Sequence, residues 1–146
     1  YLILFSTALE LTVKNKTIMN NLIIDAAKDE IILTLIINKN SYTCRKENSK
    51  INFDKLTIII EEYLTKNEVT LGDIKNIYVN RGPGSFAGIR NSLSISKALF
   101  LTKQINYYCF SFLDFEGFEK IKYEDIPDLC DKFNLKKNLI NPIYLR

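Results

Sequence analysis

The sequence predicts an α/β fold in which one mixed sheet is covered by helices. Three β-prone runs separated by short turns come before residue 47, and a helical segment, a β-prone run, a second helical segment and a fifth β-prone run follow them. This order of elements favours a single sheet with helices packed on it. The chain has 146 residues, of which 47% are hydrophobic, and this is enough for one domain with its own core.

The first three β-prone runs predict an antiparallel meander. Residues 21–25 form a short apolar run that ends in an acid, and residues 30–38 are rich in β-branched side chains. Residues 38–40 are expected to turn the chain, because asparagine tolerates the left-handed backbone region. Residues 41–46 then return as the third strand.

Residues 51–66 are predicted to form a helix. Apolar side chains recur there at spacings of three and four: Phe53, Leu56, Ile60 and Leu64. Three more widen the apolar arc beyond what one contact with a sheet requires: Ile58, Ile59 and Tyr63. Two explanations are open, a well-buried helix or a helix whose second side contacts a partner protein.

The remaining elements complete the predicted sheet. Residues 70–73 match a capped helical turn, and they are followed by a strand over 74–80, a helix over 86–103 and a fifth strand over 105–110. Small residues recur at every fourth position of this second helix: Gly88, Ser92 and Ser96. Such a ridge lets another element approach closely. A short helix over 124–134 and a terminal strand within 136–146 are expected after the sheet.

The loop before the second helix is the most specific stretch of the chain. It holds three of the five glycines in the run Arg81-Gly82-Pro83-Gly84-Ser85-Phe86-Ala87-Gly88-Ile89-Arg90. A strand, a glycine-rich turn and a helix in succession bring backbone N–H groups close to an anion, or two backbones close to each other. A Walker A loop or a dinucleotide-binding fingerprint would need glycine at 87, and a nucleophile elbow would need it at 83.

Composition narrows the chemistry further. The chain has no histidine, which excludes Ser-His-Asp and Cys-His catalysis and histidine-based zinc sites. Its 20 basic and 17 acidic residues are too balanced to indicate nucleic-acid binding. Cys44, Cys109 and Cys130 are far apart, so we expect buried or reduced thiols instead of a zinc ribbon or a redox pair.

The glycine-rich run resembles the Gly-Pro-Gly-Ser-Phe-Thr-Gly-Leu-Arg motif of the TsaB (YeaZ) family. Members of this family are inactive relatives and partners of the TsaD enzyme in bacterial tRNA threonylcarbamoyladenosine synthesis. Ala87 stands where the family usually has threonine. Two weaker matches are residues 22–27, similar to the family's first strand and Asp-Thr turn with Ala26 in place of threonine, and residues 142–146, similar to its Pro-x-Tyr-Leu-Arg.

The resemblance implies a domain organisation. Residues 19–113 would form a TsaB-like N-terminal lobe of the actin-like, ribonuclease-H-like (ASKHA) fold, with a mixed five-stranded sheet. Residues 114–146 would be a reduced C-terminal segment, too short for a full second lobe. Residues 1–18, before Met19, are expected to lie upstream of the fold or to pack as an extra strand. Their apolar part is too short to span a membrane, and we expect a cytoplasmic protein.

The resemblance also implies a function. The chain would be a non-catalytic scaffold that binds TsaD, with no cofactor or metal of its own. TsaD would hold the metal and transfer the threonylcarbamoyl group to adenosine in tRNAs reading codons that begin with adenine. The ATPase TsaE would join the complex, and tRNA would be contacted only indirectly. The contacts to TsaD would come from the helices 51–66 and 85–103, through Ile59, Tyr63, Phe86, Gly88, Ile89, Ser92, Leu93 and Ser96.

The roles of four polar residues are open. Asp25 is either a turn-capping residue or part of a vestigial phosphate site, as its place after the first strand of an actin-like lobe implies. Ser85 is expected to cap the second helix. Arg81 and Arg90 either make ion pairs and partner contacts or bind an anion together with the helix N-terminus. Two other functions remain open, a small nucleotide-binding relative that uses Asp25 and the loop, and a degenerate relative that forms a homodimer through the same helices.

Overall fold

The first three strands form the expected antiparallel meander. The computed structural model describes residues 20–144, except for the side chain of residue 53, and the expectations for residues 1–18 therefore lie outside the described residues. Strands β1 (Asn20–Asp25), β2 (Glu30–Ile37) and β3 (Asn40–Glu47) pair in sequence order. Asn38 and Lys39 form the tight turn between β2 and β3 with φ angles of 48° and 71°. The left-handed turn predicted from the asparagine is confirmed.

The helix predicted over 51–66 is two helices. α2 (Lys50–Asp54) is short, and α3 (Leu56–Lys66) begins after Lys55, whose φ and ψ angles are −102° and 12°. Ile51 on α2 is exposed, whereas Leu56 at the start of α3 is buried. The break therefore redirects the chain so that the core-facing stripe begins at Leu56.

The remaining elements of the sheet match their predicted positions closely. A 3-10 helix (Leu71–Asp73) leads into β4 (Ile74–Asn80), and Thr70 donates its backbone N–H to the Asp73 carboxylate at 2.9 Å, as a capping box requires. α4 (Phe86–Lys103) ends at a left-handed Gln104, and β5 (Asn106–Phe110) follows.

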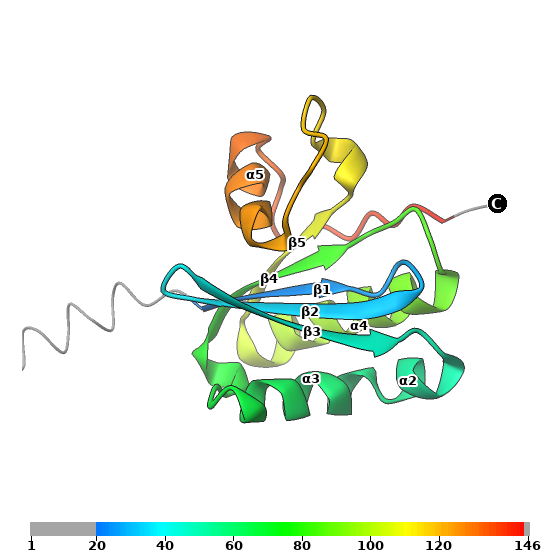
Figure 1. Cartoon of the computed structure of the whole chain (residues 1–146), viewed down its shortest axis with the longest axis vertical. Helices are drawn as coiled ribbons and strands as arrows, with labels where there is room; N and C mark the ends of the chain where they lie inside the picture. The colour runs from blue at the N-terminus through cyan, green and yellow to red at the C-terminus, as the bar shows by residue number, and fades with distance from the viewer. Residues whose placement is uncertain (1–19, 145–146) are drawn as a thin grey trace, which may run out of the picture.

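The five strands form one mixed sheet in the order β3-β2-β1-β4-β5. β1 pairs with β4, and β4 with β5, in parallel, whereas the meander is antiparallel. The predicted fold class is confirmed, because this is the arrangement of one actin-like, ribonuclease-H-like lobe. Figure 1 shows α2, α3 and α4 on one face of the sheet and the segment after β5 on the other.

The first core lies between the sheet and helices α3 and α4. It contains inward-facing side chains of every strand except β3, whose Cys44 packs at its border. The buried residues of α3 are Leu56, Ile59, Ile60, Tyr63 and Leu64, and those of α4 are Gly88, Ile89, Ser92, Leu93 and Ser96. Burial within this chain thus explains Ile59 and Tyr63 of the wide apolar arc of α3, whereas Ile58 of the same arc is exposed.

The second core lies on the opposite face, under the C-terminal segment. This segment contains two 3-10 helices (Phe112–Asp114 and Tyr123–Asp125) and α5 (Ile126–Lys132), which is shorter than the helix predicted over 124–134. Its buried residues Phe115, Ile126 and Leu129 pack against Ile23 of β1 and Tyr78 of β4. The segment therefore covers the second face of the sheet and is part of the same folded unit.

Within the described residues, the predicted terminal strand is reduced to two isolated bridges, an antiparallel one between Tyr108 and Lys137 and a parallel one between Gly84 and Tyr144. In this part of the chain no helix is both long enough and apolar enough to cross a membrane.

Candidate functional site

The glycine-rich loop connects β4 to α4 and is tightly surrounded by backbone. A Cβ atom on Gly82, whose φ angle is 106°, would lie 2.2 Å from the carbonyl oxygen of Ile143. A Cβ atom on Gly84 would lie 1.9 Å from the carbonyl oxygen of Ala27. Of the two uses predicted for this loop, the close approach of backbones is the one that the geometry supports. Glycine is required at both positions because no side chain fits there.

Short backbone hydrogen bonds attach the loop to three distant segments. Arg81 donates its N–H to the carbonyl of Phe110 in β5, and Ser85 donates to the carbonyl of Ala27 after β1, both at 2.7 Å. The N–H of Ile143 donates to the carbonyl of Arg81, also at 2.7 Å. The loop is therefore a junction between the first strand, the last strand and the C-terminal segment.

Ser85 caps α4, as predicted. Its hydroxyl oxygen accepts a hydrogen bond from the N–H of Gly88 at 3.3 Å. Pro83 is half-buried in the loop, and Ala87, at the first turn of the helix, is exposed. The hydroxyl of Ser85 is thus used by the helix that it begins.

Asp25 is buried, with 1% of its surface exposed, and its carboxylate accepts three hydrogen bonds. Its Oδ1 accepts from the N–H of Ala27 at 3.1 Å and from the side-chain amide of Asn80 at 3.0 Å. Its Oδ2 accepts from the hydroxyl of Tyr123 at 2.7 Å. The first of these bonds supports the turn-capping interpretation. Burial, and then the nearby Asp25 carboxylate, raise the pKa of Tyr123.

Sequence reasoning missed Asn80 and Tyr123. Asn80 ends β4, and its Oδ1 also accepts from the N–H of Gly82 at 2.9 Å, so one amide bridges Asp25 and the loop. An asparagine at the end of a buried strand, directly before a glycine-rich turn, was the available signal. For Tyr123 there was none, because its distance from Asp25 along the chain hides the contact.

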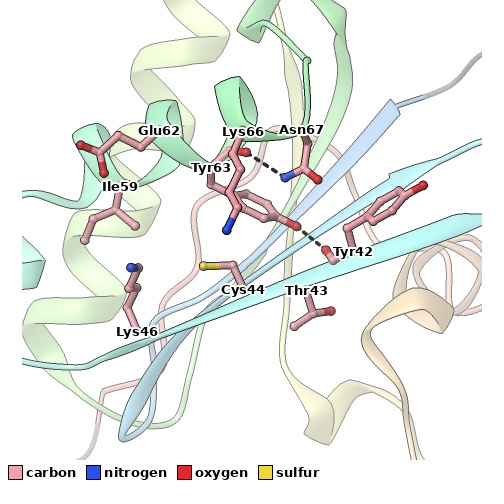
Figure 2. A pocket seen from close by; sticks show the side chains of 9 residues that line it. All are labelled: Tyr42, Thr43, Cys44, Lys46, Ile59, Glu62, Tyr63, Lys66 and Asn67. Atoms are coloured by element: carbon pink, nitrogen blue, oxygen red, sulfur yellow. Dashed lines mark hydrogen bonds between the residues drawn. The ribbon is translucent and has the colours of Figure 1, made fainter.

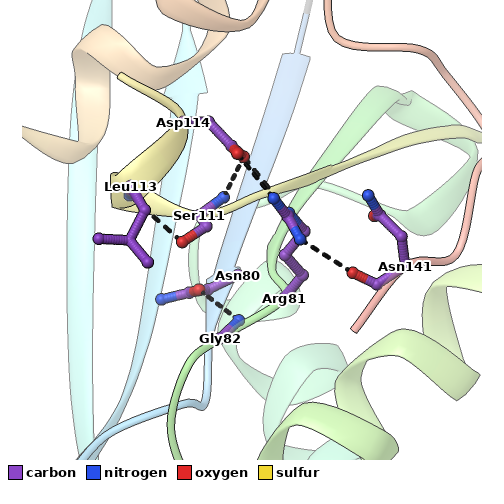
Figure 3. A network of polar contacts seen from close by, with 7 residues as sticks. All are labelled: Asn80, Arg81, Gly82, Ser111, Leu113, Asp114 and Asn141. Atoms are coloured by element: carbon purple, nitrogen blue, oxygen red, sulfur yellow. Dashed lines mark hydrogen bonds and ion pairs between the residues drawn. The ribbon is translucent and has the colours of Figure 1, made fainter. Parts of the chain in front are cut away.

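Arg81 and Arg90 do not converge on one anion site. The guanidinium of Arg81 contacts both carboxylate oxygens of Asp114, at 2.6 Å and 3.3 Å, and donates to the carbonyl of Asn141 at 3.1 Å (Figure 3). Arg90 lies over the ring of Phe86, 6.0 Å from its centroid. Asp114 also accepts from the N–H of Ser111 at 2.7 Å, so this half-buried ion pair fixes the start of the C-terminal segment.

The predicted contact residues for a partner protein require a correction. Seven of the eight are buried inside this chain: Ile59, Tyr63, Gly88, Ile89, Ser92, Leu93 and Ser96. The hydroxyls of Ser92 and Ser96 donate to carbonyls one turn earlier in α4, at 2.8 Å and 2.9 Å. The ridge of small residues faces the interior because α4 lies close to its own neighbours. Only Phe86, which is 56% exposed, remains accessible to a partner.

The accessible side of this layer carries other apolar residues. Helices α3 and α4 pack on each other, and Ile58 of α3 and Leu101 of α4 are both exposed. Phe86 stands at the first position of α4, with the ring of Tyr144 4.7 Å from its own.

The cysteines behave as expected from the sequence. All three are free thiols, and Cys109 and Cys130 are buried. Burial raises the pKa of each of these two thiols to about 12. Among residues 20–144 no group of three histidine, cysteine, aspartate or glutamate side chains is arranged to hold a metal ion.

Comparisons with known proteins agree with the fold and the motif. A family model described as TsaD, tRNA N6-adenosine threonylcarbamoyltransferase, matches residues 47–115. Two curated relatives from Buchnera aphidicola are named tRNA threonylcarbamoyladenosine biosynthesis protein TsaB. The one from subspecies Baizongia pistaciae is 31% identical over 53% of this chain and 35% of the relative. The one from subspecies Schizaphis graminum is 29% identical over 63% of this chain and 44% of the relative.

The resemblance of this chain to the TsaB (YeaZ) family is confirmed. The solved structure of YeaZ from Pseudomonas aeruginosa superposes with a TM-score of 0.59 at 19% identity, over 64% of this chain and 44% of that one, and so shares the fold. The chain spans less than half the length of the TsaB relatives that it matches. In this chain the motif loop is the junction of the fold, and α4 begins directly after it.

Proposed function

We propose that this chain is a non-catalytic scaffold that binds a TsaD-type transferase and supports threonylcarbamoyl transfer to adenosine in tRNA. The observation that carries the non-catalytic part is the internal use of the loop's polar groups. Asp25 accepts three hydrogen bonds from this chain, Ser85 caps α4 and Arg81 pairs with Asp114. No polar group of the three is left to act on a substrate. The names of the TsaB relatives support the tRNA-modification pathway.

The proposed binding surface is the outward side of the α3–α4 layer. It contains Ile58, Phe86 and Leu101, which are all exposed. Large apolar side chains in an interface usually supply most of its binding energy when they are fully covered by the partner. This surface replaces the buried residues first expected from the sequence. It lies on the same two helices, so the expected pairing of helices across the interface is kept.

Light scattering on a sizing column, with the full chain and TsaD from the same source, tests the proposal. We expect a stable one-to-one complex and tRNA modification that depends on both proteins. Leu101→Glu should weaken the complex by about tenfold or more, because a carboxylate would be buried against apolar surface. If the unmodified chain forms no complex with TsaD, the scaffold proposal is wrong.

Leu113→Glu is the matched control. Leu113 is 66% exposed and Leu101 is 67% exposed, but Leu113 belongs to the segment on the opposite face of the sheet (Figure 1). Its variant should bind TsaD normally. Normal binding by both Leu101→Glu and Ile58→Glu would reject this surface and leave the scaffold proposal in place. Modification by this chain alone, without TsaD, would reject the non-catalytic role.

A further inference from the structure

The two edges of the sheet differ in whether another segment covers them. The β5 edge is covered by the C-terminal segment, where Asn138 donates its N–H to the carbonyl of Tyr107 at 2.7 Å and its side-chain oxygen accepts from the N–H of Tyr107 at 3.0 Å. In the part of the chain that the structure describes, β3 forms the other edge and pairs only with β2. An open strand edge is a template for pairing with another extended chain.

Few groups contact the outer side of β3. The carbonyl of Glu47 accepts from Ser49 and Asn52 at the end of the strand, and the hydroxyl of Tyr63 donates to the carbonyl of Tyr42 from the side of α3 (Figure 2). Apart from these groups, no described residue outside β2 forms a hydrogen bond with the β3 backbone. Among residues 20–144 the β3 edge is therefore free to pair with a further strand.

A pocket of about 440 Å³ lies directly beside this edge, between β3 and α3. Pockets of about 300–1,000 Å³ are typical of ligand sites. Figure 2 shows the lining side chains, which come from only these two elements and the residue after α3: Tyr42, Thr43, Cys44, Lys46, Ile59, Glu62, Tyr63, Lys66 and Asn67. A strand paired with β3 would therefore place every second side chain over the pocket.

The pocket carries two lysines and one glutamate. The ammonium groups of Lys46 and Lys66 point into the space between strand and helix (Figure 2). Neither lysine, nor Glu62, forms an ion pair within the described residues. Burial raises the pKa of Tyr63 to about 12, so its hydroxyl adds no negative charge. The pocket thus has one net positive charge and two ammonium groups available to a carboxylate.

We propose that the β3 edge binds an extended acidic segment of a partner protein. The segment would add a strand to the sheet through backbone hydrogen bonds, as in β-augmentation, and would place a carboxylate between Lys46 and Lys66. The open edge requires that the bound segment has an extended backbone. The two unpaired ammonium groups require that it carries an acidic side chain. This site is separate from the α3–α4 surface proposed for TsaD, so each proposal can fail without the other.

Edge lysines also have a second known use, since they discourage unwanted strand pairing. The two roles make opposite predictions. A protective lysine leaves the edge without ligands, whereas a binding lysine selects acidic ones.

Selection from a display library of random seven-residue segments on the full chain separates these roles. We expect the recovered segments to be enriched in aspartate and glutamate. The most enriched segment, synthesised as a peptide, is then the probe. The double variant Lys46→Glu/Lys66→Glu should bind it at least about tenfold more weakly, because attraction becomes repulsion. Failure to recover any segment, or recovery without acidic enrichment, would overturn the proposal.

A matched control and a geometric readout complete the test. The control variant Lys75→Glu/Lys103→Glu changes the net charge of the chain by the same amount. Its two lysines lie on the same kinds of element, because Lys75 lies on a strand, β4, and Lys103, like Lys66, lies in the last turn of a helix. This control should bind the probe normally. Two probes are compared, one N-methylated at its odd-numbered residues and one at its even-numbered residues. Only one of the two should lose binding, because only alternate N–H groups of a strand face the neighbouring strand. Equal effects of the two lysine variants, or of the two N-methylation patterns, would refute strand addition.

Discussion

The hydroxyl of Tyr123 donates a 2.7 Å hydrogen bond to the carboxylate of Asp25, across 98 residues of sequence. Asp25 ends the central strand, and Tyr123 belongs to the segment that covers the second face of the sheet. The same carboxylate accepts from Ala27 and Asn80. One buried acid therefore connects the first strand, the motif loop and the C-terminal segment.

Tyr123→Phe tests this connection. Removing the hydroxyl leaves one carboxylate oxygen of Asp25 without its donor, and we expect the free energy of unfolding to fall by about 1–3 kcal/mol. Urea unfolding followed by circular dichroism measures the change. Tyr42→Phe, at an exposed tyrosine of the edge strand, should change stability by less than about 0.5 kcal/mol. Equal stabilities of the two variants would contradict a structural role for this bond.

Gly84→Ala tests whether the motif glycine is there for backbone contact. The added Cβ would meet the carbonyl oxygen of Ala27 at 1.9 Å, so the loop must move and the bond from Ser85 to Ala27 must lengthen. We expect a loss of at least about 2 kcal/mol in the free energy of unfolding. Gly72→Ala is the control, because its Cβ would meet nothing closer than 3.7 Å. A stable Gly84→Ala variant would show that the loop tolerates the displacement.

The Arg81–Asp114 pair should contribute more than an exposed ion pair. Their side chains are half-buried, and two contacts of 2.6 Å and 3.3 Å join them. A double-mutant cycle with alanine at both positions should give a coupling energy of about 1–3 kcal/mol. The same cycle on Arg45 and Glu30, an exposed pair at 2.8 Å, should give about 0.2–1 kcal/mol. Similar coupling energies for both pairs would mean that burial does not strengthen the Arg81–Asp114 interaction.

Stability should fall at alkaline pH. Burial raises the pKa of the Cys109 and Cys130 thiols from 9.0 to about 12, so the unfolded chain releases these protons at a lower pH than the folded chain does. Between these values the folded state binds more protons, and the free energy of unfolding must decrease as pH rises. Below about pH 8 the two thiols should have no effect. Urea unfolding across this range measures the slope, and a flat profile from about pH 9 to about pH 12 would contradict the burial of the thiols.

The local features of the fold could be predicted from the sequence because neighbouring residues determine them. The asparagine turn after β2 and the Ser85 cap of α4 are examples, since each depends on one side chain and the adjacent backbone. The break at Lys55 was missed because the apolar pattern continues through it. Tertiary contacts determine where such a helix breaks, and the apolar pattern is compatible with both a broken and a continuous helix.

The side on which α4 makes contacts could not be predicted. The ridge of Ser92 and Ser96 indicates a close approach, but it does not say whether the neighbour is this chain or another. The partners of the motif glycines were also hidden, because Ala27 and Ile143 lie far from Gly84 and Gly82 in the sequence. The motif was thus predictable as a motif, whereas its role as a junction required the fold.

The cover on the second face of the sheet has a consequence during translation. Ile23 and Tyr78 are synthesised well before Ile126 and Leu129, which bury them. The last strand, β5, ends at Phe110, so at about 5–20 residues per second Leu129 is added about 1–4 seconds after the sheet is complete in sequence. During that interval the nascent chain presents a row of apolar strand residues to the solvent. At this stage of synthesis the exposed apolar strand residues can either aggregate or bind a ribosome-associated chaperone.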